Sequence, residues 1–344
     1  MFVLGGGTRQ GLPVEALLQL IGLGLLAATV VRVRVSPIPA RAGALLLLCC
    51  ALLAWLLAQA LPLSMDLVSG LPGRQPLIDA LRQAGVDSGR MSVSLDREAT
   101  LRAVLAWFAP VGLFAYTLTL RTTQRIGLLR WAVGLAGASV LLGMMQLADG
   151  PDSALRWHAF TNENSAVGPF ANRNHLASAL AMSIPLATAA LIERMGRASP
   201  SRDIAGIALA AVVLVAVVLG LALTRSRAGI LLGGLAMLGS LLLAWRWRVG
   251  DEGGRHQRGV RRTVLLVIAL GMIAAVQWGL AGIADRLDKD PLDDFRWTIA
   301  ENTWEIAQRY GPLGTGAGTF EQLYEAEAPL LRASDKIVNR AHND

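Results

Sequence analysis

Long apolar runs, separated by short polar connections, make up most of this chain. About 20 apolar residues in a helix are enough to cross the hydrocarbon core of a bilayer. Eight stretches reach that length, and we expect spanning helices at Leu12–Val31, Gly43–Leu63, Leu101–Leu120, Ile126–Leu147, His175–Ile192, Ile204–Thr224, Ala228–Trp245 and Thr263–Ile283. The pattern predicts an all-α polytopic membrane protein.

Arginines gather in alternate connections between these runs, near residues 32–41, 121–130, 194–202 and 246–262. Because arginine-rich loops stay on the cytoplasmic side of a membrane, we expect these connections to be cytoplasmic. The other polar parts of the chain are then expected outside: the N-terminus, residues 64–100, residues 148–174, the turn Thr224–Arg227 and the chain after about Ala284.

Three regions follow from this arrangement. Residues 1–100 form a two-helix membrane region with an outer loop, residues 101–283 a transmembrane core, and residues 284–344 an outer helical segment. In the outer loop we expect a short helix at Pro76–Ala84 and a capped helix start at Ser94–Leu101. We assign no function to that loop.

The outer segment is expected to begin with an amphipathic helix that stops at Gly311-Pro312. Trp297 and Trp304 share one face of it, and we expect this face to pack against the membrane domain or to lie at the outer interface. The glycine-rich run Gly314–Gly318 comes next. A nucleotide-binding loop must follow a strand, and no strand precedes this run, so we interpret it as a tight, flexible turn.

Composition narrows the chemistry further. Hydrophobic residues are 53% of the chain, charged residues 17%, and the mean hydropathy is +0.47, which excludes an ordinary soluble domain. The net charge is +7, but the basic residues are spread through short loops, so we expect no nucleic-acid partner. The four histidines lack zinc-ligand spacing, and Cys49 and Cys50 are adjacent in an apolar run. We therefore expect no metal site and no cofactor.

Polar residues precede the fifth expected span, where Asn172, Arg173, Asn174 and His175 follow one another. A helix N-terminus presents unpaired N–H groups and a positive dipole end, which attract phosphate. The simpler alternative is that Asn172 or Asn174 caps the helix and that Arg173 anchors it at the interface.

Two further arginines, Arg225 and Arg227, lie between two spans on the expected outer side, where arginines should be scarce. A guanidinium group suits a bidentate phosphate contact, so an anion is expected there. The alternative is that both side chains only extend to the lipid headgroups. Arg296 is placed in the first turn of the outer helix, where a cation is unfavourable unless an anion or acid is near. His342 is the third residue from the end of the sequence, and its position alone does not identify it as catalytic.

Taken in order, five short motifs resemble the O-antigen ligase and polymerase superfamily. They are Gly-x-Phe-x-Asn-x-Asn-x-x-Ala at Gly168–Ala177, Ser-Arg-x-Gly at Ser226–Gly229, Arg-Trp at Arg296–Trp297, Pro-Leu-Gly-x-Gly-x-Gly-x-Phe at Pro312–Phe320 and His-Asn-Asp at His342–Asp344. The resemblance covers roughly residues 100–344. It implies a GT-C-like membrane glycosyltransferase that is independent of metal and uses an undecaprenyl-diphosphate-linked glycan as donor. The acceptor would be a lipid A core sugar, another glycan or a protein.

The resemblance also assigns roles. Arg227 and Arg296 would hold the diphosphate and stabilise its charge as it leaves. His342 would accept the proton of the acceptor hydroxyl, with inversion at the anomeric carbon. Auxiliary contacts to phosphate or sugar would come from Asn172, Arg173, Asn174 and Arg225. The enzyme would lie in the bacterial inner membrane with its active face in the periplasm. Relatives continue past the histidine, so we expect a C-terminally truncated sequence, with or without activity in this form.

Two other classes of protein stay open at this point. A polysaccharide or small-molecule transporter would also be polytopic and rich in arginine, but transporters usually bury their charges near mid-membrane within repeated halves. A noncatalytic scaffold explains the spans but not the recurring outer arginines and asparagines. The sequence favours the glycosyltransferase, and it does not separate ligase, polymerase and protein glycosylation.

Overall fold

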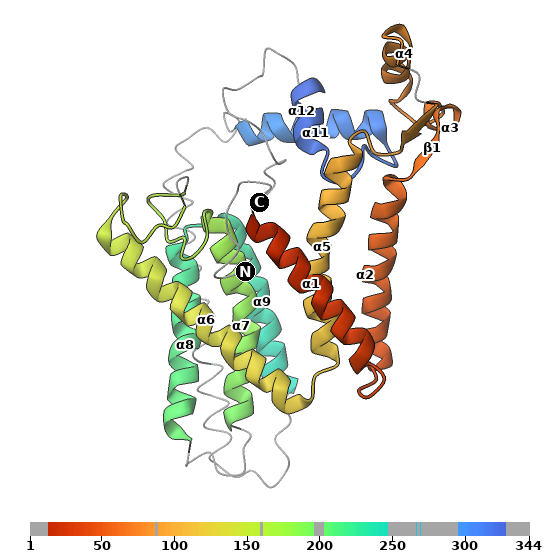
Figure 1. The fold of residues 1–344 in the computed structure, drawn as a ribbon. Helices are drawn as coiled ribbons and strands as arrows, with labels where there is room; N and C mark the ends of the chain where they lie inside the picture. The colour runs from red at the N-terminus through yellow and green to blue at the C-terminus, as the bar shows by residue number, and fades with distance from the viewer. Residues whose placement is uncertain are drawn as a thin grey trace. The chain divides into compact units, whose positions relative to one another are not determined.

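The computed structural model describes residues 13–86, 89–158, 161–195, 203–246 and 295–327, together with Leu266 and Ala269. The chain divides into two compact units (Figure 1). Unit 1 consists of residues 121–288 with the two extreme ends of the chain. Unit 2 consists of residues 15–120 and 289–343, so it is built from two stretches that are distant in sequence.

Seven helices in the described residues are long and apolar enough to cross a membrane. They are α1 (Pro13–Arg32), α2 (Ala40–Gln59), α5 (Arg97–Leu118), α6 (Thr122–Asp149), α7 (Arg173–Met195), α8 (Ile204–Leu223) and α9 (Arg227–Arg246). Each corresponds to one of the spans predicted from the sequence. The all-α polytopic architecture is therefore confirmed, and the eighth predicted span, residues 263–283, lies outside the described residues apart from Leu266 and Ala269.

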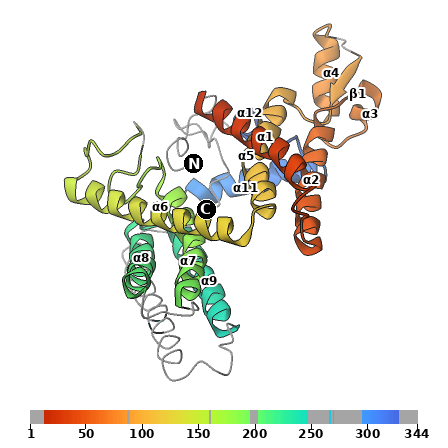
Figure 2. The same cartoon turned by 60° about the horizontal axis from the view of Figure 1, so that its bottom comes forward.

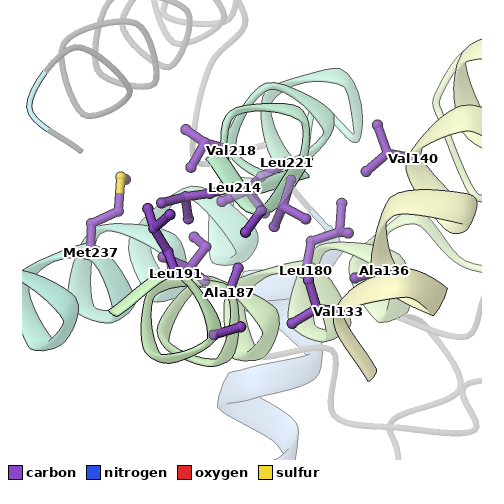
Figure 3. Close-up of a cluster of buried hydrophobic side chains, with 14 of the residues drawn as sticks. Val133, Ala136, Val140, Leu180, Ala187, Leu191, Leu214, Val218, Leu221 and Met237 are labelled. Carbon is purple, nitrogen blue, oxygen red and sulfur yellow. The ribbon is translucent and has the colours of Figure 1, made fainter. Parts of the chain in front are cut away.

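Unit 1 is a bundle in which α7 is the most deeply buried helix. The apolar side chains of α6, α7, α8 and α9 meet around it, among them Val133, Leu180, Leu214 and Met237 (Figure 3). In both ribbon views α6 runs at a slant across α7 and α8 (Figure 2). Small residues allow close approach between membrane helices, as where a Cβ on Gly229 of α9 would lie 2.4 Å from the Cβ of Ala177 of α7.

Unit 2 combines three candidate spanning helices with a part that lies outside those helices, called the outer part after its predicted side of the membrane. Gly22 of α1 faces Gly112 of α5 so closely that a Cβ on Gly112 would lie 2.3 Å from the Gly22 carbonyl oxygen. The outer part contains β1 (Pro62–Ser64), α3 (Met65–Ser69), α4 (Gln75–Gln83), β2 (Arg90–Ser92), α11 (Phe295–Tyr310) and α12 (Phe320–Glu327). In Figure 1, α11 runs crosswise to α2 and α5.

The loop between α2 and α5 is more ordered than its sequence indicates. The predicted short helix and the predicted capped helix start are both present, as α4 and as the beginning of α5. At the second, the Asp96 Oδ1 accepts a hydrogen bond of 2.9 Å from the Ala99 N–H. The antiparallel pairing of β1 with β2 was not predicted. It frames a small apolar core of Met65, Val68 and Ile78.

Helix α11 ends at Tyr310, directly before Gly311-Pro312 as predicted, but its buried face differs from the expected one. Trp297 and Trp304 are 64% and 66% exposed, so neither is packed in a protein core. The packed face instead carries Ile299 and Ile306, which lie against α12. Packing of the tryptophans against the membrane domain, or their position at the outer interface, stays a prediction.

Candidate functional site

The segment that leads into α7 is held by one buried glutamine of α6. The side-chain amide of Gln146 donates hydrogen bonds to the carbonyl oxygens of Gly168, at 2.7 Å, and Leu155, at 3.0 Å. Its oxygen accepts from the N–H groups of Gly168, at 2.8 Å, and Val167, at 3.3 Å. All the hydrogen-bonding groups of this amide are used, so Gln146 fixes the loop without leaving a buried polar atom unpaired. It lies inside an apolar run, and the sequence analysis missed it.

A second polar side chain, Arg156, organises the same loop. Its guanidinium group donates to the carbonyl oxygens of Asn162, Glu163 and Ser165. His158 Nε2 lies 3.2 Å from the Pro169 carbonyl oxygen. These contacts are internal to the loop, and they hold it in one shape over the start of α7.

The N-terminus of α7 is capped by side chains of the chain itself. Asn172 Oδ1 accepts from the Asn174 N–H at 2.8 Å, and Asn162 Oδ1 accepts from the Arg173 N–H at 2.9 Å. The His175 N–H is bonded to the Asn172 carbonyl oxygen. The N–H groups of Arg173, Asn174 and His175 are thus already paired within the chain, which favours the helix cap, whereas contacts of these residues to a phosphate stay a prediction. Asn172 is the helix cap, one of the two alternatives for this segment.

The turn between α8 and α9 is built from two buried hydroxyl residues. Thr224 and Ser226 are at most 1% exposed. The Thr224 hydroxyl donates to the Leu221 carbonyl oxygen at 2.7 Å, and Ser226 Oγ accepts from the Gly229 N–H at 2.9 Å. Ser226 thereby caps α9. This leaves the intervening Arg225 with a φ of 52°, in the left-handed region that non-glycine residues seldom adopt.

Both arginines of this turn point to solvent rather than to a protein partner. Arg225 and Arg227 are exposed, and among the described residues neither guanidinium group has an ion pair or a hydrogen bond. The first turn of α9 contains no acidic residue. Two cations at the positive end of a helix dipole raise the local potential, and an anion bound there relieves it. The turn is therefore suited to a phosphate group.

The structure brings this turn next to the segment that precedes α7. The Ala166 N–H donates to the Leu223 carbonyl oxygen at 3.3 Å. Gly229 contacts Ala177 one turn into α7. The arginine turn and the Asn172–Asn174 segment are thus neighbours in unit 1, although about 50 residues separate them in the sequence.

In unit 2, a buried arginine joins the outer loop to the segment after α11. Arg74 is 1% exposed, and its Nη2 donates hydrogen bonds of 2.7 Å to the carbonyl oxygens of Val93 and Gly314. Its guanidinium carbon lies 5.2 Å from the centre of the Tyr310 ring. Burial lowers the pKa of Arg74 below its ordinary value. Nothing near it in the sequence distinguishes Arg74 from a solvated loop arginine, so it too was missed.

The glycine run after α11 is a tight turn, as predicted, but a fixed one. Gly314, Gly316 and Gly318 all have positive φ. A Cβ on Gly316 would lie 2.3 Å from the Ser94 hydroxyl oxygen, so only glycine fits there. The turn is bonded on both sides of this contact, because the Leu95 N–H donates to the Thr315 carbonyl oxygen and the Thr100 hydroxyl to that of Ala317.

Two residues expected at the site are not placed by the structure. Arg296 lies in the first turn of α11, and its side chain is outside the described part of the chain. His342 falls outside the described residues altogether. The convergence of Arg227, Arg296 and His342 stays a prediction.

Comparison with known families gives the arginine turn its context. Residues 209–344 match the family model described as O-Antigen ligase. Over these residues the chain is similar to the O-antigen ligase family. Neither the comparison with curated proteins nor that with solved structures gave a match.

The O-antigen ligase segment begins inside α8 and includes the Thr224–Arg227 turn, α9, α11 and α12. Arg225, Arg227, Arg296 and His342 therefore all lie within it. Arg74 and the Asn172–Asn174 segment precede the matched residues. The membrane-spanning helices and the family match together support a multi-pass membrane protein of the O-antigen ligase and polymerase type.

Proposed function

We propose that this protein transfers a glycan from undecaprenyl diphosphate to a hydroxyl group of an acceptor sugar, on a lipid A core or a growing polysaccharide. The observation that carries the proposal is the pair of exposed arginines on a fixed turn inside the O-antigen ligase segment. The buried Thr224 and Ser226 hold that turn, so the two guanidinium groups are presented with little freedom of the backbone.

The chemistry follows from the charge that develops when the sugar leaves its carrier. As the anomeric carbon to oxygen bond breaks, the diphosphate takes up negative charge, and Arg227 together with Arg296 stabilises it. Guanidinium groups supply this charge directly, so the proposed reaction needs no metal ion. Arg225, Arg173, Asn172 and Asn174 are proposed to make secondary contacts to the phosphates or the first sugar.

His342 is proposed as the general base. It accepts the proton of the acceptor hydroxyl while that oxygen attacks the anomeric carbon from the side opposite the diphosphate. One displacement of this kind inverts the configuration at that carbon. The proton ends on the imidazole ring and the electron pair of the broken bond on the diphosphate.

The membrane side is proposed from the arginine-rich connections. With these in the cytoplasm, the Thr224–Arg227 turn faces the periplasm, where the carrier lipid presents its completed glycan. The protein is accordingly placed in the bacterial inner membrane with a periplasmic active face.

The test is glycan transfer in membranes of a strain that lacks its own ligase and expresses the full-length gene. Removing one preorganised cation from developing charge costs about 10²–10³ in rate, so Arg227→Ala is expected to lose transfer by that factor while Arg227→Lys keeps part of it. His342→Ala is expected to lose transfer as well. Its residual transfer rate, measured against pH, should lack the dependence on a general base that the wild-type rate shows.

Arg34→Ala is the matched control. Arg34 is also an exposed arginine beside the end of a spanning helix, but it lies in the expected cytoplasmic connection after α1. Its replacement should leave transfer within twofold of the wild type. An Arg227→Ala protein that is inserted normally and transfers glycan at the wild-type rate contradicts the proposed role of the turn.

A further inference from the structure

A groove of about 510 Å³ lies in the outer part of unit 2. One wall comes from the loop before α5 and the other from α12 and the end of α11. Its lining includes Leu77, Asp96, Tyr310, Gln322, Ala326 and Glu327. The first two precede the O-antigen ligase segment and the other four belong to it, so the groove joins the two parts of the chain.

The lining combines an apolar floor with a few polar groups. Leu77, Leu95 and Leu323 supply aliphatic surface. Asp96 uses its Oδ1 to cap α5, and among the described residues its Oδ2 has no hydrogen-bond partner; Gln322 offers an exposed amide. A sugar ring has apolar C–H faces and a rim of hydroxyl groups, which need aliphatic surface and carboxylate or amide partners respectively.

Charge in the groove argues against other ligands. Glu327 accepts from the Tyr310 hydroxyl at 2.7 Å and pairs with Arg309. The charges of Glu327 and Arg309 cancel, so the carboxylate of Asp96 gives the groove a net negative charge. This charge repels phosphate groups and nucleic acids. An acyl chain laid over Asp96 and Gln322 would remove the hydrogen bonds that the carboxylate and the amide make to water, which disfavours it. An uncharged or cationic polar chain fits best.

The two walls are fixed to each other before any ligand arrives. Arg74 bonds to Gly314, at the start of the glycine turn that leads into α12, and the Ala317 N–H of this turn donates to Gln59 Oε1 of α2 at 3.2 Å. A groove whose walls are already ordered binds with less loss of conformational entropy than one that must close.

We propose that this groove binds the sugar chain of a substrate. The inference rests on the proposed function for the identity of the ligand, but not for the existence of the site. The chain bound is either the acceptor glycan or the glycan carried by the donor, since both present the same hydroxyl-rich chemistry.

The experiment measures binding apart from transfer. Full-length protein in lipid nanodiscs is titrated with two free oligosaccharides, one released by mild acid from the host lipopolysaccharide core and one released from the donor lipid. Ala326→Trp fills the groove from an exposed position on α12 and is expected to weaken binding at least tenfold. Gln322→Ala removes one exposed hydrogen-bonding group and is expected to weaken it about two- to tenfold.

Glu325→Trp is the matched control, because Glu325 is exposed on the same helix and does not line the groove. If the core oligosaccharide binds and Ala326→Trp abolishes that binding, the groove is an acceptor subsite. If the donor oligosaccharide behaves in this way, the groove is a donor subsite. Absence of binding for both sugars, or equal binding by the Ala326→Trp and Glu325→Trp proteins, overturns the inference. Binding without any transfer leaves the groove standing and refutes only the proposed reaction.

Discussion

Replacing Arg74 by methionine is a direct test of how the outer part of unit 2 is held together. Methionine keeps most of the apolar stem but removes the guanidinium group. The two hydrogen bonds of 2.7 Å, to Val93 and Gly314, are lost, together with the contact to the Tyr310 ring. The carbonyl oxygens that Arg74 served are left in a partly buried environment.

The expected loss is about 2–4 kcal/mol. Hydrogen bonds from a charged donor contribute about 1.5–3 kcal/mol each, and a cation over an aromatic ring adds about 0.5–2 kcal/mol. Part of this sum is offset because the mutant no longer buries a charge, which is the same desolvation that lowers the pKa of Arg74. At about 1.4 kcal/mol for each factor of ten, the net loss corresponds to roughly 30- to 1000-fold more frequent opening.

Hydrogen exchange of two amides reads this opening directly. The Leu95 N–H is bonded to the Thr315 carbonyl oxygen and the Ala317 N–H to Gln59 Oε1, so both exchange when the turn after α11 separates from the outer loop and from the end of α2. The Gly229 N–H in unit 1 serves as an internal reference that should not change.

Arg82→Met on α4 is the control for loss of a positive charge. Arg82 is exposed, its distance to Asp79 is 3.9 Å, and such a pair contributes about 0.5 kcal/mol or less. The reasoning fails if Arg74→Met leaves the protection of Leu95 and Ala317 within threefold of the wild type, or if Arg82→Met lowers it as much.

Two further predictions concern pH and packing. The pKa of Tyr310 is raised above its ordinary value of 10.0 by burial and by its hydrogen bond to Glu327. The outer part should therefore keep its stability below about pH 10 and lose it as the pH rises further; Tyr310→Phe should lack this alkaline decline in thermal melts. Gly229→Ala places a Cβ against Ala177 and should lower the melting temperature by several degrees, whereas Gly234→Ala, with no atom within 4 Å, should not; equal effects contradict the close packing of α7 and α9.

The spanning helices could be predicted because one constraint, the thickness of the apolar layer, sets their length and composition. The seven described spans agree with that pattern. For a shorter element, the sequence determines less well which face is buried. On α11 both the Trp297–Trp304 stripe and the Ile299–Ile306 stripe have helical spacing, and only tertiary packing against α12 selects the second.

The candidate site was predictable where the chemistry is local. Arg225 and Arg227 are conspicuous because arginine is costly at that depth. At the start of α7 the sequence allowed either a cap or a phosphate contact for Asn172, and the choice depends on a hydrogen bond that no pattern specifies. Arg74 was not predictable, since it acquires its role from a carbonyl 240 positions later.

That distance has a consequence for synthesis of the protein. A ribosome adds about 5–20 residues per second, so Arg74 leaves it roughly 10–50 s before Gly314 is made. During this interval Arg74 stays hydrated, and the surface that later contacts Gly314 and Tyr310 stays exposed. Premature contact of that surface with another nascent chain is the hazard of this discontinuous architecture, and faster elongation through the intervening residues shortens the exposure.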